Sequence, residues 1–82
     1  MMIGERFDLM SIELQNGKQK DGSWLIRGET YTFVESFSER YTDGFSTIVQ
    51  RESDKKYFQY FSECKTVWLE VYLKPTTVWE YV

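Results

Sequence analysis

Residues 44–61 read GFSTIVQRESDKKYFQYF, and this stretch decides the fold class of the 82-residue chain. Side chains alternate with a period of two along 45–50 and again along 57–61, which is the spacing of the two faces of a β-strand. A charged tip, ESDK at 52–55, separates the two runs. The stretch therefore predicts an antiparallel β-hairpin.

Turn residues divide the rest of the chain into runs of the same kind. Strong turn pairs are Asn-Gly at 16–17 and Asp-Gly at 21–22 and 43–44, and Pro75 follows the last long run. Thr, Val, Ile, Tyr, Phe and Trp fill the runs between the turns, as is typical of a pleated sheet. We expect one all-β domain over residues 1–82, a small antiparallel barrel or a strongly curved sheet of about six to seven short strands, because barrel closure removes exposed edges.

The N-terminal half carries two further expectations. Residues 6–14, RFDLMSIEL, fit either a strand or a helix with an apolar stripe. We expect a strand, because the Asn-Gly pair at 16–17 suits a hairpin and residues 24–26 would be its partner. The aromatic residues of the run 31–37 are predicted to share one face of a strand.

The sequence lacks the residues on which most catalytic and metal sites depend. Histidine is absent and Cys64 is the lone cysteine, so no Ser-His pair, Cys-His pair or zinc ligand set can be assembled. The acidic residues show no calcium-loop spacing, and the glycines are isolated turn residues. We expect a non-enzymatic protein with no metal and no cofactor. A lone cysteine suits the reducing cytoplasm, and Cys64 is interpreted as a small buried residue or an incidental thiol.

The formal net charge is −3, and the acidic and basic residues are spread along the whole chain. Proteins that bind duplex DNA usually carry a basic stripe that neutralises phosphates, so direct duplex binding is disfavoured. No segment approaches the roughly 20 apolar residues that a membrane helix requires, and the N-terminus has no basic region followed by an apolar run. We expect a cytoplasmic protein that does not enter the membrane.

Aromatic and acidic side chains share one side of the strand-like run TVWLEVYL. Trp68, Glu70 and Tyr72 have one phase on this run. Trp79 and Tyr81 share a phase on the next run, and the rings form one patch if the two runs pair. Three interpretations are open: a core beneath another strand, a protein interface, or a platform on which bases stack. The core interpretation is favoured.

Carboxylates decide between the two surface interpretations. Glu70 and Glu80 lie among the strand aromatics, and a carboxylate beside a phosphate lowers affinity by like-charge repulsion. A protein partner with a basic, nucleic-acid-binding surface is therefore favoured. The segment ESFSERYTDG at 35–44 adds an acidic and aromatic group, for which a solvated loop is the simpler interpretation. Its candidate binding residues are Glu35, Glu39, Tyr41 and Asp43.

The C-terminal half has a familiar layout. Residues 35–82 contain, in order, TDGFSTIV, RESDKK, YFQYF and LKPTTVWEYV, and this order resembles a layout in small phage-encoded host-takeover and accessory proteins. The hairpin stretch STIVQRESDKKYFQYF is similar to part of the small phage inhibitors of uracil-DNA glycosylase, in which an acidic and aromatic surface occupies a DNA-binding groove. The N-terminal half departs from those inhibitors. The resemblance implies Tyr57 and Tyr60, with Glu52 and Asp54 at the tip, as interface residues, and alternation predicts that one of the two tyrosines points inward.

The leading hypothesis is a cytoplasmic protein that acts by stoichiometric binding, as a phage-type inhibitor of a host DNA-processing or defence protein. One alternative is a small barrel that binds single-stranded nucleic acid through aromatic stacking. Another is a homo-oligomeric or virion structural protein. The predicted partner-binding residues are Glu35, Glu39, Tyr41, Asp43, Tyr57, Tyr60, Trp68, Glu70, Tyr72 and Trp79.

Overall fold

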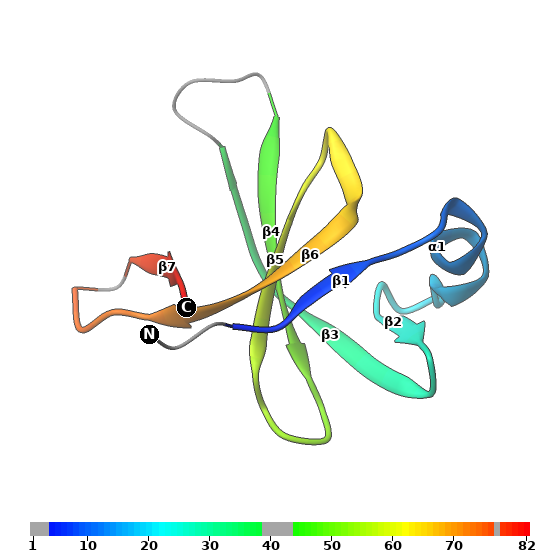
Figure 1. Ribbon diagram of the computed structural model, residues 1–82, viewed down its shortest axis with the longest axis horizontal. Helices are drawn as coiled ribbons and strands as arrows, with labels where there is room; N and C mark the ends of the chain where they lie inside the picture. The colour runs from blue at the N-terminus through cyan, green and yellow to red at the C-terminus, as the bar shows by residue number, and fades with distance from the viewer. Residues whose placement is uncertain (1–3, 39–43, 77) are drawn as a thin grey trace.

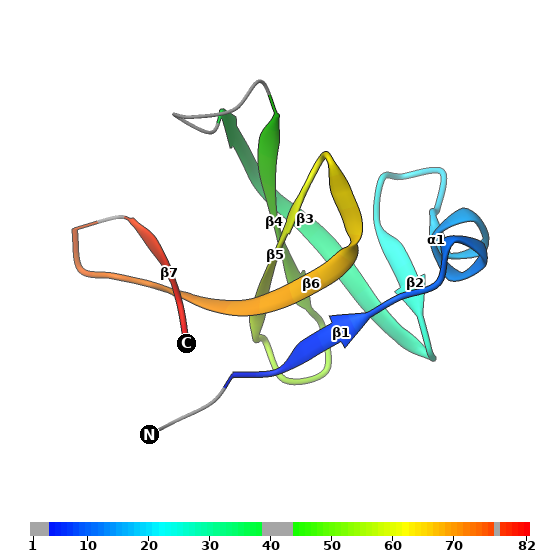
Figure 2. The ribbon, with the colours of Figure 1, turned by 45° about the horizontal axis from the view of Figure 1, so that its top comes forward.

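Figure 1 shows the fold in the computed structural model, which describes residues 4–38, 44–76 and 78–82. The helix and strands of these residues are β1 Arg6–Asp8, α1 Ser11–Gly17, β2 Trp24–Ile26, β3 Glu29–Ser38, β4 Phe45–Arg51, β5 Tyr57–Phe61, β6 Cys64–Leu73 and β7 Trp79–Tyr81. The strands form an antiparallel sheet in the order β1-β6-β5-β4-β3-β2, and β7 pairs with β6 beside this path. The sheet curls into a half-barrel (Figure 2), which confirms the prediction of an all-β fold with a strongly curved sheet.

The hairpin at 44–61 forms as the alternation predicts. Strands β4 and β5 pair in antiparallel register. At the tip, the Lys55 amide donates to the Arg51 carbonyl at 2.8 Å, and the Asp54 carboxylate accepts a hydrogen bond from the Lys56 amide at 3.2 Å. Lys55 adopts a φ of 62°, the left-handed conformation that tight loops require. Local hydrogen bonds therefore close this hairpin.

The inner face of the half-barrel holds the main core, which is built around Trp68. This ring is 1% exposed, stacks on Tyr60 with 5.2 Å between ring centroids and meets Tyr31 edge-on at 5.1 Å. The indole nitrogen of Trp68 donates to the Lys65 carbonyl at 2.9 Å, so its polar atom is paired. The other buried members of the core are Leu9, Trp24, Ile26, Val49 and Phe58. The interpretation of Trp68 as a core residue is confirmed.

The predicted strand over residues 6–14 is wrong beyond β1. The chain turns into α1 shortly after β1, where the Met10 amide donates to the Glu13 carboxylate at 3.1 Å. Gly17 of the Asn-Gly pair ends the helix instead of making a hairpin: a Cβ there would lie 2.6 Å from Ile26 Cδ1, so only glycine lets the helix press against β2. Consequently β1 pairs with β6, and β2 pairs with β3. Among the described residues, no helix has the length and apolarity needed to cross a membrane.

Helix α1 lies between the two ends of the sheet, β1 and β2 (Figures 1 and 2). Arg27, in the turn before β3, donates to the Glu13 carboxylate at 2.8 Å and to the Asp8 carbonyl at 3.3 Å. The turn itself is tight, because Arg27 and Gly28 have φ values of 51° and 81°, the left-handed pair of a type I′ hairpin turn. One arginine thus ties the β2–β3 turn to both the helix and the first strand.

Strand β3 contains a β-bulge at Val34 that turns Phe37 to the face opposite to the one predicted. The register of β3 against β4 shifts between Phe33 and Glu35. One extra residue in a strand exchanges the two faces beyond it. Tyr31 and Phe33 therefore lie on the inner face and Phe37 on the outer face, so the prediction that the aromatic residues of this run share one face is wrong.

Candidate binding site

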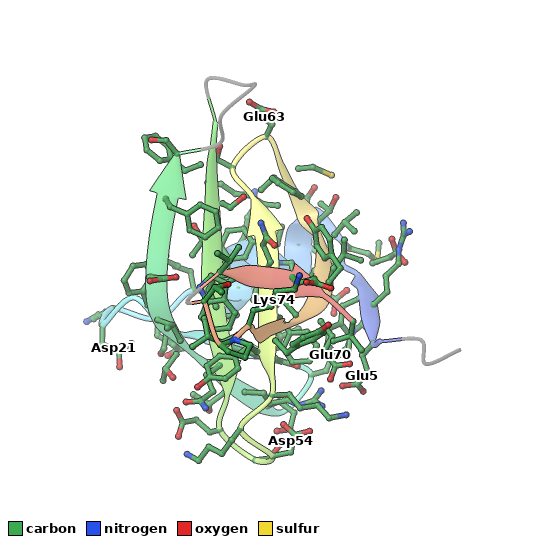
Figure 3. All side chains as sticks on the ribbon, turned by 90° about the vertical axis from the view of Figure 1, so that its left-hand side faces the viewer. Glu5, Asp21, Asp54, Glu63, Glu70 and Lys74 are labelled. Atoms are coloured by element: carbon green, nitrogen blue, oxygen red, sulfur yellow. The ribbon has the colours of Figure 1, made fainter. Side chains whose placement is uncertain are left out.

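The β6–β7 hairpin crosses the outer face of the sheet, as Figure 3 shows with β7 in front of the other strands. In this hairpin, Trp79 lies opposite Leu73 and Tyr81 opposite Val71. Directly opposed residues of an antiparallel pair share a face. Trp79 and Tyr81 therefore lie on the face opposite to Trp68, and the prediction of one patch formed by the rings of both strands is wrong.

Trp79 is the centre of a cleft on the outer face. This outer cleft is lined by Glu35, Phe37, Val78 and Trp79 and has a volume of about 310 Å³. The Trp79 ring packs against Tyr57 with 4.8 Å between ring centroids, and its Nε1 donates a hydrogen bond to the Glu35 carboxylate. These two contacts fix the orientation of an indole that is only half-buried.

The part of the sheet that carries the cleft is tightly packed. The cross-strand register puts Ile48 and Gln59 in line with Glu35, and Ser46 in line with Phe37. Ile48 and Ser46 are 0% exposed, and Gln59 is 6% exposed. Because the bulge in β3 turns Glu35 and Phe37 toward this face, both side chains stand on a closely packed sheet that holds their positions.

The structure brings Glu35, Tyr57 and Trp79 of the predicted binding residues together at the outer cleft. Tyr60 and Trp68 lie in the inner core instead. Tyr60 is 7% exposed, whereas Tyr57 packs on the outer face, which confirms that one of these two tyrosines points inward. Glu39, Tyr41 and Asp43 lie outside the described residues.

Glu70 and Tyr72 are engaged in contacts between strands. The Glu70 carboxylate accepts a hydrogen bond from the Glu5 amide at 3.1 Å and lies 3.6 Å from Lys56 Nζ. The Tyr72 hydroxyl donates to the Glu80 carboxylate at 3.1 Å. Glu70 thus joins the chain before β1 to the β4–β5 hairpin, and Tyr72 joins β6 to β7. Neither is among the described residues that line the outer cleft.

The hairpin tip, where the resemblance to phage inhibitors implies interface residues, is organised by Arg51. The Arg51 guanidinium lies 2.6 Å from the carboxylates of both Asp54 and Glu5. Hydrogen bonding from Arg51 lowers the pKa of Asp54 from its ordinary value of 3.8 to about 2. The Glu52 carboxylate accepts a hydrogen bond from the Thr32 hydroxyl at 2.8 Å. Both acidic side chains of the tip are therefore engaged within the domain.

Sequence analysis missed Phe37 and Val78 as cleft residues and Arg51 as the cation that organises the tip. The alternation pattern carries no sign of the bulge that turns Phe37 outward. Val78 is 55% exposed because it stands just before β7, at the mouth of the cleft. A signal for Arg51 was available, since it is the one cation directly before the acidic tip residues Glu52 and Asp54.

Other surface features carry less chemistry than the outer cleft. A larger depression of about 510 Å³ lies between the turn at 19–23 and the β2–β3 hairpin, and no aromatic residue is found among the described residues that line it. Cys64 is exposed rather than buried, with its Sγ 3.8 Å from the Thr66 hydroxyl, which leaves the interpretation as an incidental thiol. The described ranges contain no group of His, Cys, Asp or Glu side chains placed to hold a metal ion.

Comparisons with protein-family models, with curated proteins and with solved structures found no match. The resemblance to phage proteins therefore stays a prediction. What the site can bind has to be argued from its own residues. The outer cleft offers an aromatic wall, two further apolar side chains and one carboxylate, which suits an apolar side chain that lies beside a cation.

Proposed function

We propose that this protein is a non-enzymatic module that binds another protein stoichiometrically through the outer cleft. The observation that carries the proposal is the Trp79 indole, held by Glu35 and Tyr57 at the centre of a cleft with apolar walls. Tryptophan and tyrosine are the residue types that most often supply binding energy when a partner buries them. A ring that is already fixed loses little conformational freedom on binding.

The charge of the cleft favours a basic partner surface. The Oε1 atom of Glu35 accepts the hydrogen bond from Trp79, and among the described residues no lysine or arginine forms an ion pair with Glu35. A lysine or arginine of the partner would gain a charge-assisted hydrogen bond there. Single-stranded nucleic acid is the weaker candidate, because its phosphates would meet this carboxylate and a chain of net charge −3.

In its narrower form, the proposal makes this protein a cytoplasmic, phage-type inhibitor of a host protein that binds nucleic acid. Two observations support this form. The hairpin stretch at 46–61 resembles part of the small phage inhibitors of uracil-DNA glycosylase. A basic nucleic-acid-binding groove is also the kind of protein surface that an aromatic and acidic cleft complements.

Affinity capture from nuclease-treated bacterial lysate tests the proposal with three tagged proteins. The wild-type chain and Ile12→Lys are expected to retain one protein in near-equal amount, and Val78→Lys is expected to lose it, because a cation in the cleft repels a basic partner. Val78 and Ile12 are 55% and 53% exposed, so both changes leave the core intact, but only Val78 lines the outer cleft. Retention that is equal in all three proteins, or a wild-type column that retains no protein, would overturn the proposal.

A further inference from the structure

The edge of β3 has a long segment that no described strand covers. β3 runs from Glu29 to Ser38, but β2 pairs only with residues 29–31. Along residues 32–38, β3 pairs with β4 on one edge, and its other edge has no strand partner within the described ranges. Figure 3 shows the upper part of β3 at the border of the sheet, and no other ribbon runs along the edge of β3 that faces away from β4.

Hydrogen bonding fixes which residues of β3 point their backbone groups at β4. The Glu52 amide donates to the Thr30 carbonyl at 2.9 Å, so Thr30 faces the β4 side. Backbone groups alternate in direction along a strand. Thr32, which lies opposite Gln50, therefore also faces β4, and the residues between them face the other edge.

The same orientation resumes beyond the bulge. Glu35 lies opposite Ile48, which is the next residue of β4 with the same orientation as Gln50, so Glu35 faces β4. The backbone amides and carbonyls of Ser36 and Ser38 therefore point to the free edge. A strand added there would find regularly spaced donors and acceptors.

This edge also lacks the residues that normally block strand addition. Proteins protect exposed edges with lysine, proline, bulges or short strands. The sequence of β3, ETYTFVESFS, contains no lysine, arginine or proline, and its bulge lies at Val34, before the segment 35–38. Phe33 and Val34 are 58% and 39% exposed beside it. The segment 35–38 is thus a regular and unprotected edge.

We propose that this edge of β3, at residues 35–38, accepts an extended basic segment of the partner protein by strand addition. The proposal rests on the function proposed above and specifies how the partner binds. The added strand pairs with the backbone of Ser36 and Ser38. Its side chains on the outer face enter the outer cleft, with an apolar residue against Trp79 and a lysine or arginine beside Glu35.

Charge selects a basic segment over a second copy of this chain. The acidic residues of β3 are Glu29 and Glu35, and β3 has no basic residue. Two copies paired edge to edge along β3 would bring these like charges together, in chains that each have a net charge of −3. A segment that carries lysine or arginine replaces that repulsion with attraction.

A synthetic peptide tests the strand-addition geometry directly. The probe is acetyl-Thr-Lys-Thr-Val-Thr-Lys-Thr-amide, which has its lysines and its valine on one face of an extended strand, and it is titrated into the isotope-labelled full chain. Amide exchange at Ser36 and Ser38 is expected to slow about tenfold at a peptide concentration of about ten times Kd, because only the free protein exchanges. The Trp79 indole signal should shift, since the cleft is filled at the same time.

Two altered peptides separate backbone pairing from side-chain contact. One has N-methyl groups on alternate backbone nitrogens, placed to remove the ladder hydrogen bonds, and the other has glutamate in place of each lysine. Both are expected to bind at least about tenfold more weakly than the probe. Equal binding of the N-methylated peptide, equal binding of the acidic peptide, or no binding of the probe would each overturn the proposal.

Two variants of the protein distinguish failure of strand addition from failure of the proposed function. Ser36→Pro removes an edge amide at a position where an edge strand tolerates proline, and Val78→Lys puts a long cationic side chain into the outer cleft. Loss of the captured partner in both variants is expected. If Ser36→Pro retains the partner and Val78→Lys loses it, strand addition is wrong and the proposed function stands. If both retain it, the proposed function is wrong. A wild-type dimer in sedimentation that Ser36→Pro abolishes would assign the edge to a second copy and overturn the basic segment.

Discussion

Trp68 and Trp79 have the same side chain, and the two faces of the sheet hold them differently. On the inner face, Trp68 is 1% exposed and its indole nitrogen donates to the Lys65 backbone carbonyl. On the outer face, Trp79 is half-buried, packs on Tyr57 and donates to the Glu35 side chain. The inner ring is enclosed by its own chain, whereas the outer ring is positioned but left open.

This difference teaches how a small domain divides its aromatic residues between stability and binding. On the inner face, Phe7 of β1 and Leu14 of α1 pack against the core, and Arg27 ties the helix to the β2–β3 turn. On the outer face, β7 is a short strand that crosses the sheet and covers part of it. The closely packed inner face supplies the core, and the partly covered outer face supplies the cleft.

Trp68→Ala is expected to have the largest effect on stability and is the strongest test of this comparison. Losing the ring leaves a cavity beside Tyr31 and Tyr60, which costs about 3 to 5 kcal/mol of unfolding free energy. Trp79→Ala, the matched change on the outer face, is expected to cost about 1 kcal/mol. Urea titration followed by circular dichroism measures both values. Equal losses would show that the two faces are packed alike.

Acidification is expected to weaken the domain through the Arg51 cluster, at the end of the inner face near the hairpin tip. Arg51 lies 5.0 Å over the Phe58 ring and lowers the pKa of Asp54 from 3.8 to about 2. A lowered pKa in the folded state means that the contribution of Asp54 is complete above its unfolded pKa and is lost as the pH falls toward the folded value. The free energy of unfolding should therefore fall more steeply between about pH 4 and about pH 2 in the wild type than in Asp54→Asn.

A double-mutant comparison tests whether the loss of stability in acid comes from the pair formed by Arg51 and Asp54. In an Arg51→Met background, the change Asp54→Asn should alter the dependence of unfolding free energy on pH much less, because the guanidinium that is the main cause of the lowered pKa is gone and only the weaker effect of Lys56 remains. An undiminished effect of Asp54→Asn in this background would assign the shift to another group.

Glu13→Gln is expected to have the smallest effect on the free energy of unfolding. It tests the contribution of α1, whose Leu14 packs against the core of the inner face. The change removes the ion pair between Glu13 and Arg27, which is partly exposed and therefore weak. Glu13 is the better position to change, because Arg27 has a φ of 51° and a substitution there would also act on the turn. The loss should be smaller than for Trp79→Ala and should vanish at about 1 M salt, where surface charges are screened. A loss that salt does not reduce would point to packing instead.

The parts of the fold that were predictable are those whose determinants lie close together in the sequence. The hairpin at 44–61 carries its own alternation and its own tip hydrogen bonds, so its strands were predicted correctly. The N-terminal segment was not, because the role of Gly17 depends on Ile26, a contact between two elements that the local pattern does not contain.

Some residues of the candidate site could be predicted from the sequence, but their meeting in one cleft could not. Glu35 and Trp79 were identified from their residue types in the sequence, and Tyr57 from the resemblance to phage inhibitors. Their meeting depends on the bulge at Val34 and on the register of β7 against β6, and the alternation of residues in the sequence indicates neither feature. The same register placed Trp68, predicted for the same patch, on the other face of the sheet.

The pairing of β1 with β6 also sets an order of events in the cell. Phe7 lies beside Trp68 in the finished sheet, near the opposite end of the chain. Translation runs from the N-terminus, so Phe7 leaves the ribosome long before its partner exists. β1 therefore cannot enter the sheet until this distant partner is available, whereas the two strands of the β4–β5 hairpin are close together in the sequence and can pair without a distant segment.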